Sequence, residues 1–135
     1  VPQSLYGDIE YQHPFEVAER TATMLRKELD CDVVICLSHI GYQYEMSNRP
    51  SDVLMAENTR NIDVILGGHT HTFLPSANQI MDKDDQPVII NQVGWAGIML
   101  GRIDLVLEKN KRDKCYTCKN QYLQGTIDNT IIKHK

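Results

Sequence analysis

The stretch Asp63-Val64-Ile65-Leu66-Gly67-Gly68-His69-Thr70-His71 joins an apolar run to two histidines that are two residues apart. A short apolar run of this kind predicts a buried strand. The glycine pair removes Cβ bulk where the chain must turn at the end of that strand. In extended backbone, residues i and i+2 point to the same side, so we expect His69 and His71 to face one metal ion or two neighbouring ions.

A second apolar run ends in a third histidine. The residues Val33-Val34-Ile35-Cys36-Leu37 lead directly into Ser38-His39-Ile40-Gly41. Two strand-end loops that both carry histidine are the usual arrangement of an α/β active site. His39 is therefore the third candidate ligand. Ser38 is expected to orient its loop, because no Ser-His-acid order marks it as a nucleophile.

The remaining pattern predicts helices and strands in alternation, followed by consecutive strands. Apolar residues spaced three and four apart predict a helix over 14–29, and a second helix over 51–59 begins with Ser51 or Asp52 as its cap. We expect strands over 32–37, 62–66, 87–91, 101–108 and 115–123, the last two as a hairpin, with irregular structure over 1–12 and 73–86 and a ragged tail over 125–135. This order predicts a mixed or parallel sheet with an antiparallel edge.

Composition and charge limit the function. The 135 residues are at most one domain, and 41% hydrophobic residues are enough for a core. A net charge of −4 gives no attraction to nucleic acid or to anionic membranes. No apolar stretch approaches the roughly 20 residues of a membrane span. Cys31 and Cys36 are expected to pack in the core, and the lone Cys115-x-x-Cys118 pair lacks the second pair of a zinc knuckle.

Four segments resemble the second half of a calcineurin-like metallophosphoesterase domain, most closely that of the 5′-nucleotidase branch in its Bacteroidetes-type form. They are Leu37–Gly41, Asp63–His71, Asn91–Gly97 and Leu100–Asp104. The resemblance implies an α/β fold, the distal half of a four-layer α/β/β/α sandwich whose mixed sheet carries helices on one face. Residues 1–123 would be the C-terminal half of that domain and residues 124–135 a tail.

The same resemblance implies a site for two divalent metal ions, with zinc, manganese, iron or cobalt as candidates. His39 and His69 would bind one ion and His71 the other. The family's Asp-x-His, Gly-Asp and Asn-His-Glu segments have no counterpart here, so we expect them in a half that precedes Val1. The bridging carboxylate and the histidine that assists the leaving group would lie there too. Alone, this chain is expected to hold at most one metal weakly and to be inactive.

The function implied is hydrolysis of a phosphomonoester, with a nucleoside 5′-monophosphate as the substrate and a separate domain for the nucleoside, in an exported or periplasmic protein. Asn91 either contacts this substrate or only ends its strand. Two alternatives stay open: a non-catalytic metal-binding or assembly fragment that needs the N-terminal half, and a phosphodiesterase of the same superfamily. The sheet face toward the absent half should be apolar and uncovered, which predicts self-association.

Overall fold

The computed structural model describes residues 2–45, 48–107 and 115–123. Its main sheet has the strand order β1-β2-β4-β3, built from β1 (Ile35–Leu37), β2 (Val64–Leu66), β3 (Asn78–Met81) and β4 (Pro87–Asn91). Strands β1, β2 and β4 run parallel, and β3 pairs antiparallel with β4 at the edge. The prediction of a mixed sheet is confirmed, but its antiparallel edge is formed by β3, a strand that was not predicted.

Strand β3 corrects the prediction that residues 73–86 are irregular. It begins with two polar residues, Asn78 and Gln79, which hide the alternation expected of a strand. A tight turn explains why it pairs with β4. The Asp82 carboxylate accepts hydrogen bonds from the backbone N–H groups of Asp84 and Gln86, at 2.7 and 2.9 Å. Such local bonding by an Asp side chain is a common way to build a turn.

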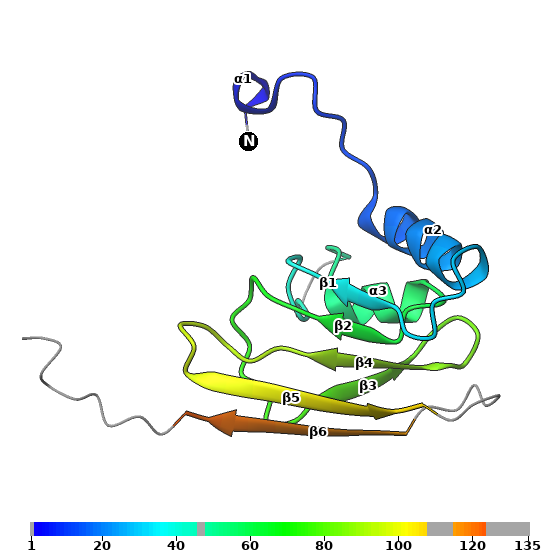
Figure 1. Cartoon of the computed structure of the whole chain (residues 1–135). Coiled ribbons are helices and arrows are strands. Elements are labelled where there is room, and N and C mark those ends of the chain that lie inside the picture. The colour runs from blue at the N-terminus through cyan, green and yellow to red at the C-terminus, as the bar shows by residue number, and fades with distance from the viewer. Residues whose placement is uncertain (1, 46–47, 108–114, 124–135) are drawn as a thin grey trace, which may run out of the picture.

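Three helices precede or separate these strands: α1 (Gln3–Tyr6), α2 (Pro14–Lys27) and α3 (Asp52–Asn58). The long helix α2 has Pro14 at its first position and Glu16 in its first turn, both favourable there. The four-residue helix α1 corrects the expectation of irregular structure over residues 1–12. It buries no residue and projects away from the rest of the molecule (Figure 1).

The core lies between the helices and one face of the main sheet. Ala22 of α2 and Ala56 of α3 are 2% and 0% exposed, and they pack in one cluster with Ile65 of β2 and Ile90 of β4. Cys31 and Cys36 pack against the same cluster, as predicted. The two large helices therefore cover one face of the sheet, as the sequence predicted.

A separate hairpin lies on the side of the main sheet opposite the helices (Figure 1). Strands β5 (Met99–Val106) and β6 (Cys115–Tyr122) pair antiparallel and run alongside β4 and β3 (Figure 1). The predicted hairpin is confirmed, but the expectation that the chain has a single sheet is wrong. Residues 109–114 and 124–135, expected as a turn and a tail, lie outside the described residues.

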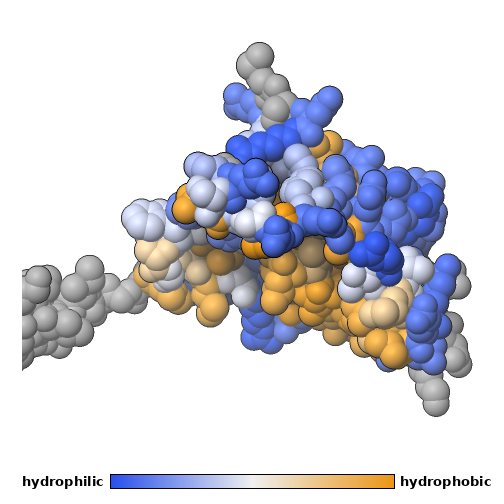
Figure 2. Space-filling model, turned by 90° about the horizontal axis from the view of Figure 1, so that it is seen from above, coloured by the Kyte–Doolittle hydropathy of each residue, from blue (hydrophilic) through white to orange (hydrophobic). Residues whose placement is uncertain are grey.

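The hairpin leaves the β1 and β2 part of its sheet face uncovered. Ile35 and Leu37 of β1 are 51% and 81% exposed, and Leu66 of β2 is also exposed. Figure 2 shows apolar side chains gathered along one flank of the molecule, whereas hydrophilic side chains dominate the opposite flank. An apolar, uncovered face agrees with the expectation from the sequence. Among the described residues, none of the helices has the length and apolar character that crossing a membrane requires.

Candidate metal centre

The three candidate ligands lie on loops at the carboxyl edge of the main sheet. Because β1, β2 and β4 are parallel, their carboxyl ends meet at one edge. Ser38 and His39 follow β1, the Gly67–His71 segment follows β2, and Gln92 follows β4. The backbone N–H of Ser38 donates to the Leu66 carbonyl at 2.9 Å, which continues the pairing of β1 and β2 into the loops.

His39 and His69 are brought together. Their ring centroids are 5.4 Å apart, with the rings inclined at 70°. Two imidazoles on one tetrahedral zinc, with Zn–N bonds of about 2.0–2.1 Å, would place their ring centroids about 5 Å apart. The spacing therefore suits one ion shared by the two rings. Both residues are exposed, so a metal could reach them from solvent.

His71 lies differently. Its ring stacks on Trp95, with centroids 6.0 Å apart and planes inclined at 19°. Within residues 2–45, 48–107 and 115–123, no group of three or more His, Cys, Asp or Glu side chains is placed to hold a metal ion. The spacing of His39 and His69 therefore suits one metal ion, but the described residues place no third such ligand beside them.

The backbone of the second loop corrects the sequence argument. His69 and His71 have φ values of 71° and 53°, in the left-handed region, and not in the extended conformation that the sequence predicts. The loop turns sharply because the Thr70 N–H donates to the Gly68 carbonyl at 2.9 Å. Left-handed residues other than glycine are uncommon and concentrate at functional sites.

Gln92 holds this turn in place, and the sequence analysis missed it. Its amide is 2% exposed and makes three hydrogen bonds to the loop. The Nε2 group donates to the Gly68 carbonyl at 2.8 Å, and Oε1 accepts from the Thr70 hydroxyl at 3.0 Å and from the Thr72 N–H. The one available signal was a polar residue directly after a buried strand.

Asp52 lies beneath the first loop and was also missed, except as an alternative cap for its helix. Ser51 takes the cap role, since its hydroxyl accepts from the Leu54 N–H at 3.3 Å. The Asp52 carboxylate instead accepts from the Ser38 hydroxyl at 2.5 Å. Burial raises the pKa of Asp52, and this shift is partly opposed by the Ser38 hydroxyl and by the charge of His39.

Asn91 has a different partner from the one expected. It is the last residue of β4 and 5% exposed. Its amide exchanges two hydrogen bonds with Asn120 of β6, at 2.9 and 2.7 Å. In this structure Asn91 fastens the hairpin to the main sheet, and a contact with substrate stays a prediction.

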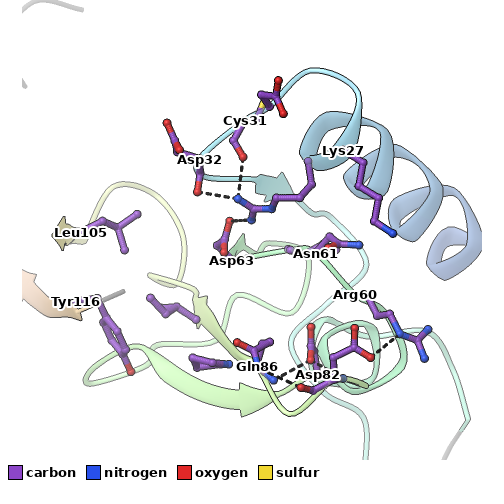
Figure 3. Close-up of a pocket in the computed structure, with 16 residues that line it drawn as sticks. Lys27, Cys31, Asp32, Arg60, Asn61, Asp63, Asp82, Gln86, Leu105 and Tyr116 are labelled. Atoms are coloured by element: carbon purple, nitrogen blue, oxygen red, sulfur yellow. Dashed lines mark hydrogen bonds and ion pairs between the residues drawn. The ribbon is translucent and has the colours of Figure 1, made fainter. Parts of the chain in front are cut away.

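A pocket of about 870 Å³ opens at the opposite, amino edge of the sheet (Figure 3). Both of its arginines are paired with carboxylates. Arg26 binds the Asp63 carboxylate and also donates to the carbonyls of Cys31 and Asp32, at 2.8 and 2.7 Å. Arg60 pairs with Asp84 at 2.8 Å. The pocket contains none of the three histidines.

The fold and the histidine edge define part of an α/β domain with a candidate metal centre. Comparison with known proteins shows which proteins the chain resembles. The chain is 32% identical over 101 residues, 75% of its length, to the trifunctional nucleotide phosphoesterase protein YfkN of Bacillus subtilis. It is 26% identical over 137 residues, 90% of its length, to an apyrase of Tabanus yao. No protein-family model matches it.

A solved structure shows the same fold. The chain superposes on part of the 5′-nucleotidase precursor from Thermus thermophilus with a TM-score of 0.71 and 21% identity, over 83% of this chain and 23% of that one. The chain spans 6% of the Bacillus protein and 23% of the Tabanus apyrase. It is therefore similar to proteins of the 5′-nucleotidase and nucleotide phosphoesterase kind over a part of their length.

Proposed function

We propose that this chain forms one part of a metal-dependent phosphomonoesterase of the 5′-nucleotidase kind, with His39, His69 and His71 as ligands of a two-metal site. The observation that carries the proposal is the 5.4 Å approach of the His39 and His69 rings at the carboxyl edge. That edge is where α/β proteins usually bind ligands. The substrate we propose is a nucleoside 5′-monophosphate.

The chain's own residues would have three tasks. His39 and His69 would hold one metal ion between them, and the exposed His71 would turn toward a second. Bound divalent ions polarise phosphate oxygens and lower the pKa of a bound water. They also offset the charge of an anionic substrate at the surface of a protein whose net charge is −4. Trp95, 56% exposed beside His71, forms the rim of the site.

Completion of the site requires further ligands, which we propose come from another part of such a domain, packed on the exposed β1–β2 face. The exposed side chains of Ile35, Leu37 and Leu66 on this face support the proposal. A chain without that covering part should self-associate. Light scattering over a concentration series tests this, with Leu37→Asn expected to reduce the association and Leu5→Asn, equally apolar and exposed on α1, to leave it unchanged.

Isothermal titration with Zn²⁺ tests the metal centre. We expect weak binding of one ion, and a loss of about tenfold or more in affinity for His39→Ala and for His69→Ala. His13→Ala is the matched control, because His13 is also an exposed histidine but lies beside Phe15 at the start of α2. Equal Zn²⁺ binding by all of these chains would contradict the proposed site.

A phosphatase assay separates the proposal from its alternatives. An aryl phosphate is incubated with Mn²⁺ and this chain, alone or mixed with the remaining part of a relative's catalytic domain. Turnover on mixing supports a shared active site. Zn²⁺ binding without turnover in either case supports a non-catalytic metal-binding or assembly role. Comparing monoester with diester substrates would distinguish a phosphodiesterase.

A further inference from the structure

Asp52 is an unusual residue for its position. It is 0% exposed, and one of its carboxylate oxygens, Oδ2, is buried with no hydrogen-bond partner among the described residues. Its other oxygen, Oδ1, accepts from the Ser38 hydroxyl. A buried carboxylate with so few partners destabilises a fold. Its place in the core therefore requires an explanation other than stability.

Asp52 holds the His39 loop at both ends. At the start of the loop, its side chain accepts a hydrogen bond from the Ser38 hydroxyl at 2.5 Å. At the end of the loop, its backbone N–H donates to the Gly41 carbonyl at 2.7 Å. His39 lies between these two points. The position of its ring is thus linked to the first turn of α3, which packs in the core through Val53.

The same carboxylate contacts the loop that carries His69. A Cβ added to Gly67 would lie 2.1 Å from Asp52 Oδ2, so the glycine backbone passes directly over the carboxylate. A Cβ added to Gly68 would lie 2.9 Å from Nδ1 of His39. Only glycine allows two loops to approach this closely. Asp52 therefore underlies both loops of the histidine pair.

From these contacts we propose that Asp52, acting through the Ser38 hydroxyl, is a positioning residue that fixes the His39 ring against His69 and so sets the metal affinity of the pair. The proposal rests on the metal-binding function proposed above. The placement of the ring, however, can be measured on the metal-free chain, so the two ideas can fail separately.

The experiment uses Ser38→Ala, because Asp52→Ala risks loss of the fold. Ser38→Thr keeps a hydroxyl and serves as the conservative variant. Thr59→Val is the matched control: it also removes one hydroxyl bond, from Thr59 to the Met55 carbonyl at 2.7 Å, but at the far end of α3. The first measurement is the NMR cross-peak between the ring protons of His39 and His69 in metal-free protein. The second is calorimetric Zn²⁺ affinity.

We expect the ring cross-peak to be lost in Ser38→Ala and retained in Ser38→Thr and Thr59→Val. Where Zn²⁺ binds, its affinity should fall about tenfold in Ser38→Ala alone, as expected when a group that orients a ligand is removed. A Ser38→Ala chain that keeps the cross-peak and the affinity would overturn the proposal, as would loss of the cross-peak in Ser38→Thr. Loss confined to Ser38→Ala in chains that bind no Zn²⁺ would support positioning and reject the metal site.

Discussion

Both edges of the main sheet carry titratable side chains, but the two edges differ in how these side chains are paired. At the amino edge, carboxylates meet arginines, as in the pairs of Arg26 with Asp63 and Arg60 with Asp84. At the carboxyl edge, His39 and His69 are exposed and contact each other, and no hydrogen bond to either imidazole occurs among the described residues. Beneath them, Asp52 leaves one oxygen unpaired.

This contrast shows that the pocket and the candidate metal centre need not coincide. The pocket of about 870 Å³ lies at the amino edge, but both of its guanidinium groups already pair with carboxylates, those of Asp63 and Asp84. The histidine edge offers uncommitted donors. Availability of ligands, more than volume, therefore identifies the carboxyl edge as the candidate site.

The largest effect we predict is on the packing of the carboxyl edge. In Gly67→Ala the new Cβ would lie 2.1 Å from the Asp52 carboxylate and 3.1 Å from the Gln92 amide, and both residues are buried. We expect a loss of about 3 kcal/mol in the free energy of unfolding, at the upper end of overpacking effects. Urea denaturation measures it.

The control is Gly97→Ala. Gly97 has nothing within 4 Å of an added Cβ, and its φ of 67° leaves only backbone strain, about 1–2 kcal/mol. Equal stability of the two variants would mean that Gly67 does not pack closely against Asp52. The proposed tight packing of the carboxyl edge would then be wrong.

A second prediction tests whether the two edges are independent. Arg26→Met removes the guanidinium that binds Asp63 and two backbone carbonyls, and the contacts with Asp63 and the Cys31 carbonyl are partly buried. We expect a loss of about 2–3 kcal/mol in unfolding free energy, somewhat below that of a fully buried pair. Zn²⁺ affinity should not change. His69→Ala should show the reverse pattern, with Zn²⁺ affinity reduced and stability nearly unchanged, because exposed side chains contribute little to folding.

Arg102→Met is the control for charge removal alone. Arg102 pairs with Asp104 on the exposed face of β5. The substitution should therefore leave both the free energy of unfolding and the Zn²⁺ affinity unchanged. A fall in Zn²⁺ affinity in Arg26→Met would instead show that the amino edge supports the histidine loops, so the two edges would not be independent.

The sequence predicted the elements whose signal is local. The apolar spacing of α2 and the apolar runs of β1 and β2 were sufficient, and the family resemblance, which pairs His39 with His69, agrees with the approach of their rings. It did not reveal β3, whose first residues are polar because the strand lies at an edge. Long-range contacts were also hidden. Gln92 and Asp52 act on loops 24 and 14 residues away in sequence, and no spacing rule marks them.

The buried Asp52 leads to a third, smaller prediction. Its pKa is raised by burial above the ordinary value of 3.8, so the folded state binds more protons than the unfolded state just above that pH. Stability should therefore fall as the pH rises from 3.8 through the raised pKa, and then stay level. Asp52→Asn lacks this ionisation. The stability of the wild type relative to this variant should decrease over that interval, as measured by urea unfolding at several pH values. Parallel pH profiles for the two chains would mean that the carboxylate is solvated.

The smallest effect concerns His71, which the structure places against Trp95 and apart from the other two histidines. Trp95 is the one tryptophan in the chain, so its emission reports on this contact alone. If His71 turns to bind a second ion, as proposed, Zn²⁺ added beyond one equivalent should change the emission slightly, and His71→Ala should abolish that change. His39→Ala should retain it. An emission that is insensitive to Zn²⁺ in the wild type would count against a second ion at His71.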